Sequence, residues 1–350
     1  MSNYFRLFAN CMPIKGAIRS LICDTQRGGF KFIPNGLLDI LVENKYNSIS
    51  EIKSMFDNQY DTTIDEYFEF LIENEFIFFC EKDEIDLFPD IDLSWDMPAH
   101  IANAIIDINE YSNYEIEKII DDLDKLLCKH IHLRIYSIKN IEYLEKIMVL
   151  LENKKILSIE IFVHFSLDLT KENIYVLMCK YPRLYSVVLH SAPTDEVLLQ
   201  DIESKAFIVQ IQQKIDNHTH CGFISPDYFS INISTFTESQ HHNTCLNRKI
   251  SIDVNGEIKN CPSMTKSYGN IKDTTLAEAL AKEGFKDMWH IKKDQIKVCQ
   301  DCEFRHICTD CRAYLQDPND LYSKPAKCSY DPYTATWGVE NPTNNTLYGQ

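Results

Sequence analysis

Apolar and polar residues alternate at the start of the chain, and the pattern then changes to a helical period. Residues 4–34 alternate around Gly16 and a Gly28-Gly29 turn, which predicts two or three short strands. Three segments with apolar residues three to four apart follow, at 37–42, 49–56 (capped by Ser48) and 64–77. Strands followed by three short helices predict a small winged-helix-like domain over residues 1–90.

A second pattern begins after residues 83–98, which carry two prolines among many acidic residues and are predicted to be a linker. Strand-like and helix-like segments then alternate about every 25 residues. The expected strands are 101–108, 130–136, 156–165, 185–190 and 207–215, and the expected helices are 114–127, 141–153, 171–181 and 195–204. This alternation predicts parallel β-α-β units, and hence an α/β fold with a partial (β/α) barrel over residues 99–235.

The remaining segment, residues 236–340, has a third pattern. Residues 250–258 read as two strands around an Asn255-Gly256 turn, with Cys261 just beyond the second strand. Residues 276–289 are predicted to be helical, with Asp273 or Thr274 as the cap.

The charge balance excludes two classes of partner. The chain has 52 acidic and 35 basic residues, a formal charge of -17, which repels nucleic-acid phosphates and anionic lipids.

The N-terminus lacks the basic and apolar segments of an export signal, and no apolar run approaches the roughly 18 residues that span a bilayer. We therefore expect a cytoplasmic protein with no nucleic-acid or membrane partner.

The thirteen cysteines do not indicate a disulfide framework, because the chain has no export signal and the cytosol keeps thiols reduced. Cys221 is isolated, and the five thiols at 11, 23, 80, 128 and 179 are expected to be small buried apolar groups. The other seven gather near the C-terminus: Cys245, Cys261, Cys299, Cys302, Cys308, Cys311 and Cys328. Paired CxxC spacings of soft thiolates indicate zinc or iron–sulfur ligation.

The order of these cysteines resembles the SPASM domain of radical-SAM peptide-maturing enzymes. Ten residues separate Cys245 from Gly256 and four separate Gly256 from Cys261, before a C-x2-C-x5-C-x2-C run and a last cysteine. The x2 step between Cys308 and Cys311 departs from the x3 step of the family. The resemblance implies two [4Fe-4S] clusters, one held by Cys299, Cys302, Cys308 and Cys328, and the other by Cys245, Cys261 and Cys311.

The resemblance leaves the fourth ligand of the second of these sets open. Family members often place a cysteine about six residues before the position of Cys245, where this chain has Ser239. The candidates to replace it are Cys221, His241 and His242. His130 and His132, on an expected strand, are interpreted as histidines that line the barrel, while His218 and His220 stand beside Cys221.

One motif of radical-SAM enzymes is missing. They carry CxxxCxxC after the first barrel strand, where three thiolates hold the cluster that cleaves S-adenosylmethionine. Here the strand 101–108 runs into residues 109–113 with no cysteine before Cys128, and the spacing occurs nowhere else in the chain. We therefore expect no S-adenosylmethionine cofactor, and no catalytic residue is identified.

Taken whole, the chain resembles the SPASM-domain peptide maturases of grasp-with-spasm systems, beginning with the run at residues 7–24. That resemblance implies a PqqD-like, winged-helix-like first domain that recognises peptide, a ribosomally made precursor peptide as partner, and an ATP-grasp ligase as the second partner. The implied role is an accessory maturation factor, and whether any catalysis remains is open. The alternatives are a redox or substrate-binding iron–sulfur enzyme and a structural zinc-binding scaffold.

Overall fold

The computed structural model describes residues 4–201, 203 and 206–338, and within them the strands form four sheets. The strands are β1 (Tyr4–Leu7), β2 (Cys11–Ile14), β3 (Arg19–Asp24), β4 (Gly29–Pro34), β5 (Ile77–Cys80), β6 (Asn103–Ile108), β7 (His130–Ile138), β8 (Ser158–His164), β9 (Leu184–His190), β10 (Glu196–Gln200), β11 (Phe207–Gln210), β12 (Lys249–Ile252), β13 (Ile258–Lys259), β14 (Tyr330–Asp331) and β15 (Thr336–Trp337). The α-helices are α1 (Asn35–Glu43), α2 (Ile49–Met55), α3 (Asp61–Glu73), α4 (Ile116–Lys125), α5 (Ile141–Leu150), α6 (Lys171–Lys180), α7 (Ile233–His241) and α8 (Leu276–Ala281). Short 3-10 helices are η1 (Lys82–Leu87), η2 (His218–His220), η3 (Pro226–Tyr228), η4 (Asp287–His290), η5 (Lys293–Gln295) and η6 (Cys299–Asp301).

A small N-terminal unit contains the expected strands and three helices. Strands β2, β3 and β4 form an antiparallel sheet, and α1, α2 and α3 pack beside it around an apolar core. The structure adds strand β5, which pairs with β1 in a separate two-stranded sheet. The helix predicted over 64–77 includes Ile77, the first residue of this strand. In the structure the helix stops at Glu73, because Glu75 takes a positive φ of 54°.

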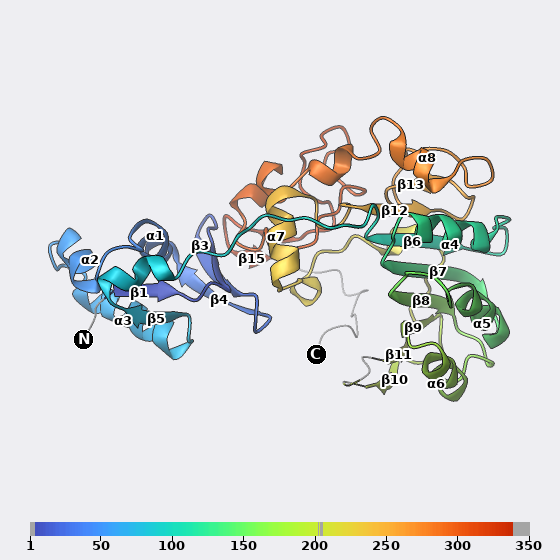
Figure 1. Cartoon of the computed structure of the whole chain (residues 1–350), viewed down its shortest axis with the longest axis horizontal. Helices are drawn as coiled ribbons and strands as arrows, with labels where there is room; N and C mark the ends of the chain where they lie inside the picture. The colour runs from blue at the N-terminus through green and yellow to red at the C-terminus, as the bar shows by residue number, and fades with distance from the viewer. Residues whose placement is uncertain (1–3, 202, 204–205, 339–350) are drawn as a thin grey trace.

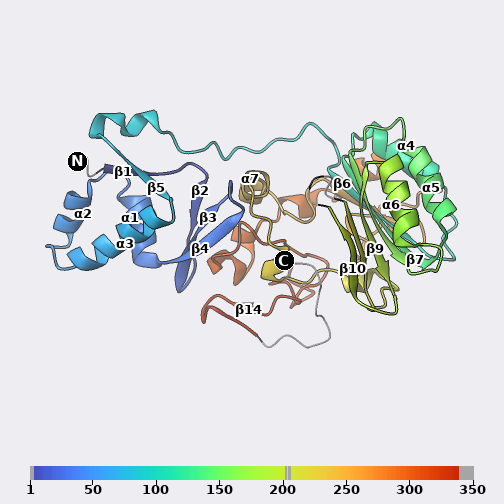
Figure 2. The ribbon, with the colours of Figure 1, turned by 90° about the horizontal axis from the view of Figure 1, so that it is seen from below.

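The largest sheet has eight strands in the order β10-β11-β9-β8-β7-β6-β12-β13. Strands β11, β9, β8, β7, β6 and β12 run parallel, and the two outer strands are antiparallel, so the sheet is mixed. Helices α4, α5 and α6 cover one face (Figure 2). Alternate strand residues point into the core under these helices, which makes this an α/β structure.

Residues 195–204 were expected to form a helix, and this expectation is wrong for residues 196–200. They form β10, which pairs antiparallel with β11 from Glu196 opposite Gln210 to Gln200 opposite Phe207. Residues 202, 204 and 205 lie outside the described part of the chain. The neighbouring strand, rather than the local apolar period, decides the conformation here.

The expected helix 276–289 is also shorter than its pattern suggested. Helix α8 ends at Ala281, and the separate 3-10 helix η4 contains Trp289. The cap is Thr275, which forms a capping box with Glu278, and not Asp273 or Thr274.

The C-terminal region joins the central sheet. Strand β12 pairs in parallel with β6, and β13 pairs with β12 after a turn in which Gly256 has a φ of 84°. The expected hairpin is therefore present, and its second strand leads to Cys261. In Figure 1 the C-terminal region spans the top of the molecule between the N-terminal unit and the sheet.

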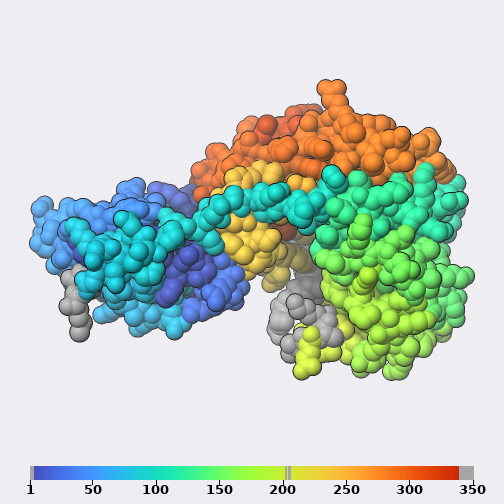
Figure 3. Space-filling view, in the orientation of Figure 1, coloured from blue at the N-terminus to red at the C-terminus, as the bar shows by residue number. Residues whose placement is uncertain are grey.

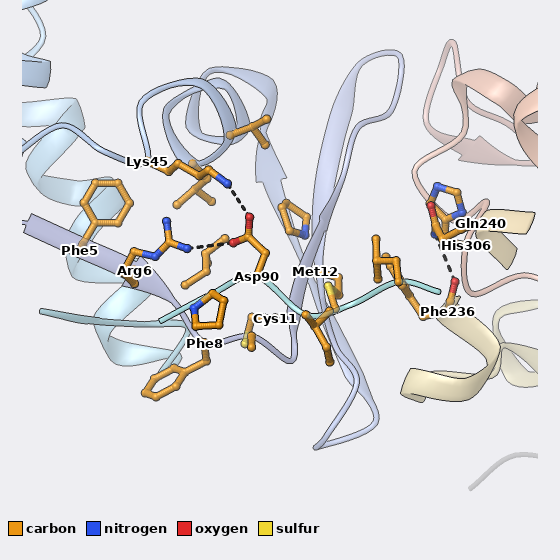
Figure 4. Close-up of a pocket in the computed structure, with 18 of the residues that line it drawn as sticks. Phe5, Arg6, Phe8, Cys11, Met12, Lys45, Asp90, Phe236, Gln240 and His306 are labelled. Carbon is orange, nitrogen blue, oxygen red and sulfur yellow. Dashed lines mark hydrogen bonds and ion pairs between the residues drawn. The ribbon is translucent and has the colours of Figure 1, made fainter. Parts of the chain in front are cut away.

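The linker passes along this bridge as an extended segment (Figure 1). Asp90 anchors it to the N-terminal unit by ion pairs with Arg6 at 2.9 Å and Lys45 at 2.5 Å (Figure 4). Beside Asp90 lies a cavity of about 320 Å³, which extends from the N-terminal unit to Phe236 of α7 and His306. The linker and the C-terminal region thus meet the first unit along one shared boundary.

The N-terminal sheet also packs directly on the C-terminal region. Arg19 Nε lies 2.8 Å from Glu303 Oε1, and the buried Phe304 ring lies against Phe30 and Phe32. These contacts fix the two regions side by side, while the central sheet lies at the other end of the molecule (Figure 3).

None of the helices in the described residues combines the length and the hydropathy that crossing a bilayer requires.

Candidate metal centres

Four cysteines of the C-terminal region line one small cavity, and we name them the outer group: Cys299, Cys302, Cys308 and Cys328. Cys299 opens η6, and Cys302 N–H closes that turn by donating to Cys299 O at 3.0 Å. Cys308 N–H donates to Phe304 O at 3.0 Å, and Cys328 N–H donates to Pro325 O at 3.2 Å. These three tight turns place all four cysteines in the lining of one cavity.

Aromatic rings enclose the outer group. Phe304, Tyr330 and Trp337 line the same cavity, and Phe304 packs against both other rings at centroid distances of 5.0 and 6.1 Å. Burial among these groups raises the pKa of the Cys308 thiol to about 12, although Lys293 opposes the shift. A metal would replace the proton and remove this cost of ionisation.

A second set, the inner group, consists of Cys221, Cys245, Cys261 and Cys311. Cys221 follows η2, Cys245 lies between α7 and β12, and Cys261 follows β13. A methyl group at Gly222 would lie 2.9 Å from Cys311 Sγ, which places this sulfur directly beside the Cys221 loop. Burial raises the pKa of Cys311 to about 11, and the nearby Cys245 and Cys221 thiols add to the shift.

Cys221 and Cys261 are close enough within the inner group to shift each other's pKa. The interaction with Cys261 lowers the pKa of Cys221, and the interaction with Cys221 raises that of Cys261 well above its usual value. Ser263 Oγ, 3.5 Å from Cys221 Sγ, and the Arg134 guanidinium also favour the Cys221 thiolate. Of the three candidate extra ligands, Cys221 is the one that interacts with a cysteine of this set.

The separation between the cysteine side chains bears on whether they bind a single metal ion or an iron–sulfur cluster. Among the described residues, no three His, Cys, Asp or Glu side chains lie close enough together to chelate one metal ion. An iron–sulfur cluster offers a separate iron to each cysteine, so its ligands stand farther apart than the ligands of a single zinc ion. The four thiols of the outer group, which line one cavity, suit a cluster of this larger kind.

The two histidine candidates lie elsewhere. His241 Nε2 is 2.9 Å from the carbonyl oxygen of Leu93, and the His242 ring packs between Trp95 and His290 at centroid distances of 5.0 and 5.5 Å. These contacts tie the linker to the end of α7. Neither histidine is placed with the inner group.

Ser239, at the position where relatives carry a cysteine, is buried and bonded to other groups. Its Oγ donates to Phe236 O at 2.6 Å and lies 3.0 Å from His306 Nδ1. The Ser239 hydroxyl is therefore occupied by contacts with α7 and His306.

The loop after β6, where radical-SAM enzymes hold their catalytic cluster, is a polar turn. Asn109 N–H donates to Ser112 Oγ at 3.0 Å, and Ser112 Oγ donates to Val254 O at 2.8 Å. Residues 109–113 contain no thiol. The turn instead braces β6 against the β12–β13 hairpin.

The scattered cysteines differ from expectation at one position. Four of them are buried: Cys11, Cys23, Cys80 and Cys128. Cys179, expected to be buried, is exposed on α6, because its position on the helix faces away from the sheet. His130 and His132 lie on β7 as expected, and His130 Nδ1 is 2.7 Å from Ser158 Oγ.

Sequence reasoning missed two lysines that contact the groups. Lys249 Nζ lies 3.4 Å from Cys245 Sγ, and Lys293 Nζ lies 3.9 Å from Cys299 Sγ. The C-terminal region has many lysines at similar spacings, including Lys292 and Lys297 beside Lys293. Only the folded structure shows which of these lysines contact a cysteine sulfur.

Comparison with known proteins bears on the C-terminal region. Residues 244–303 match SPASM, an iron–sulfur cluster-binding domain, and this range includes Cys245, Cys261, Cys299 and Cys302. The chain therefore contains a SPASM iron–sulfur domain. No curated protein matches the sequence.

Two solved structures that are similar to this chain are those of SuiB from Streptococcus suis, one bound to S-adenosylmethionine and one bound to the precursor peptide SuiA. Both have 10% sequence identity and a TM-score of 0.39. They cover 92% and 91% of this chain, and each comparison covers 98% of the SuiB chain. The iron–sulfur assignment rests on the C-terminal match.

Proposed function

We propose that this chain is an accessory maturation factor for a ribosomally synthesised peptide. In this proposal it holds two [4Fe-4S] clusters, presents the precursor to a partner ATP-grasp ligase, and does not cleave S-adenosylmethionine itself. The observation that supports the proposal is that four cysteines line one cavity and four more, Cys221, Cys245, Cys261 and Cys311, interact electrostatically, while residues 109–113 after β6 contain no thiol.

The ligand sets follow from this arrangement. The outer group, Cys299, Cys302, Cys308 and Cys328, would hold one cluster, and the inner group would hold the other with Cys221 as its fourth ligand. When bound, the clusters supply electron-transfer capacity and rigid cross-links between distant parts of the chain. Because Cys221 belongs to the loop after β11, the inner cluster would join the central sheet to the SPASM domain.

In this proposal the chain has three domains. Residues 1–90 form a winged-helix-like domain that recognises the peptide, residues 99–235 form a degenerate partial barrel, and residues 236–340 form the SPASM domain. The packing of Arg19 on Glu303 supports a fixed position of the first unit relative to the outer group. A peptide held by the first unit would therefore be held at a defined distance from the clusters.

The two alternatives predict different features. A substrate-binding cluster needs an open iron, and Cys221 beside Cys261 stands against such an opening, whereas a purely redox role needs no open iron. A zinc scaffold needs four ligands around one ion, and no set of three is this close among the described residues. The maturation role is favoured over both.

The metal assignment is tested by purifying the full chain without oxygen and measuring iron, sulfide and zinc. We expect equal iron and sulfide, little zinc, and visible sulfur-to-iron absorbance. Cys221→Ala and Cys302→Ala should each lose about half of the iron. Exposed Cys179→Ala is the matched control and should lose none. Full iron in Cys221→Ala would remove this thiol from the ligand set.

The maturation role is tested by co-purification with an ATP-grasp ligase and a precursor peptide from the same source. We expect a complex that requires residues 1–90 for the peptide, and no 5′-deoxyadenosine when the reduced protein is given S-adenosylmethionine. Formation of 5′-deoxyadenosine would show that the chain is a radical enzyme after all.

A further inference from the structure

Each cysteine group has one lysine whose ammonium lies against a sulfur. Lys249 comes from β12 and approaches Cys245, and Lys293 comes from η5 and approaches Cys299, at the distances given above. Lys293 also lines the cavity of the outer group. The two lysines come from different elements, so their shared position relative to the cysteines is not a consequence of one local motif.

The charges around Lys293 do not balance without the thiols. Lys293 is 5% exposed, and its ion-pair partner is Asp310, whose Oδ1 lies 3.5 Å from Nζ. The same oxygen lies 2.7 Å from Arg312, which is 3% exposed. Two buried cations therefore share one carboxylate, and a buried cation without a counter-charge is costly. Thiolates of the outer group, deprotonated by a bound cluster, would supply the missing negative charge.

Lys249 shows the same imbalance in a simpler form. In the described part of the chain no carboxylate lies within ion-pair distance of its ammonium, and its polar partner is Cys245 Sγ. Glu238 is near enough to interact electrostatically, but its Oε1 accepts a hydrogen bond from Asn247 Nδ2 at 2.7 Å. The inner-group sulfurs are therefore the closest source of negative charge for Lys249.

We propose that Lys249 and Lys293 are cationic partners of the inner and outer clusters, and that each raises the reduction potential of its own cluster. This inference rests on the proposed function, because it requires [4Fe-4S] clusters in both groups. A cluster bound by four thiolates is anionic, and reduction adds a further negative charge. A nearby cation in a dry site stabilises the reduced form more than the oxidised form, which makes reduction easier.

The test is a redox titration of the full, cluster-loaded chain, followed by electron paramagnetic resonance. Lys249→Met should make the midpoint of the inner cluster more negative and leave the outer one unchanged, and Lys293→Met should do the reverse. Cys302→Ala and Cys221→Ala proteins, each with one cluster, assign the midpoints. Lys297→Met is the matched control, because Lys297 is exposed and pairs with Asp320 at 2.7 Å, and it should change neither midpoint.

The outcomes separate this inference from the proposed function. Unchanged midpoints in methionine variants that retain their iron would overturn the inference and leave the clusters in place. If a methionine variant binds no cluster, retention of iron in the Lys→Arg variant supports the need for charge, and loss of iron in both variants shows a packing role instead. Zinc in place of iron in the unaltered chain would refute the proposed function itself.

Discussion

At the scale of single residues, the inner face of the central sheet holds polar groups in unusual surroundings. Arg134 and Asp107 form a buried two-point ion pair, with N–O distances of 2.6 and 2.7 Å. His132 lies on the same strand as Arg134, and its buried Nε2 has no hydrogen-bond partner among the described residues. Burial, with smaller effects of Arg134 and Lys249, lowers the pKa of His132 to about 3.

This shift makes His132 a source of acid sensitivity. An unfolded histidine takes up a proton as the pH falls below about 6.5, while the folded form stays neutral until about 3, so stability falls through this range. We expect the free energy of unfolding to drop less between about pH 7.5 and about pH 5 in His132→Gln than in the unaltered chain. Urea denaturation at both pH values measures this difference. Exposed His100→Gln is the control, and an equal drop in all three proteins would exclude the effect.

At the scale of elements, the N-terminal helices illustrate how local chemistry sets a boundary. Ser48 Oγ accepts a hydrogen bond from Glu51 N–H at 3.2 Å, and Ser48 N–H donates to Glu51 Oε2 at 2.7 Å. This capping box gives a hydrogen-bond acceptor to two backbone N–H groups at the start of α2, those of Ser48 and Glu51. The helix therefore begins where the sequence placed its cap.

Loss of this cap should cost a measurable amount. We expect Ser48→Ala to lower the free energy of unfolding by about 1 kcal/mol, because the first turn of α2 loses a hydrogen-bond acceptor. Chemical denaturation measures the change. Thr62→Ala, at an exposed position of α3, should change it by less than about 0.5 kcal/mol. Equal effects of both substitutions would contradict the capping argument.

At the scale of the whole molecule, the SPASM domain joins the N-terminal unit to the central sheet (Figure 1). The outer group lies beside the contact of Phe304 with Phe30, and the inner group lies where the loop after β11 meets β13. Metal in the two groups should therefore hold different parts of the chain. The outer centre would fix the first unit, and the inner centre would fix the sheet.

Removal of one centre should loosen one part only. We expect Cys302→Ala to increase protease cleavage of the linker at residues 88–98, because the first unit loses its support at Phe304. Cys221→Ala should leave this cleavage near the unaltered rate. Limited proteolysis followed by mass spectrometry measures the cleavage rates. Equal acceleration in both variants would mean that the two centres support one cooperative unit.

The sequence by itself determined the features that depend on local spacing. Alternating segments predicted the parallel strands and their helices, because a buried strand or helix face needs apolar residues at its own period. The CxxC steps predicted the turns that bring Cys299, Cys302 and Cys308 together, because two residues are enough to direct two sulfurs to one side. The missing CxxxCxxC motif is likewise a property of the sequence alone.

Only the tertiary structure decided the features that depend on residues far apart in the chain. Residues 196–200 became a strand because β11 offered a pairing edge, and Cys221 joined Cys261 because the loop after β11 folds back onto the SPASM domain. The roles of Lys249 and Lys293 were hidden for the same reason. A lysine in the sequence carries no sign of burial, and its charge becomes significant only when folding removes water and leaves a sulfur as its neighbour.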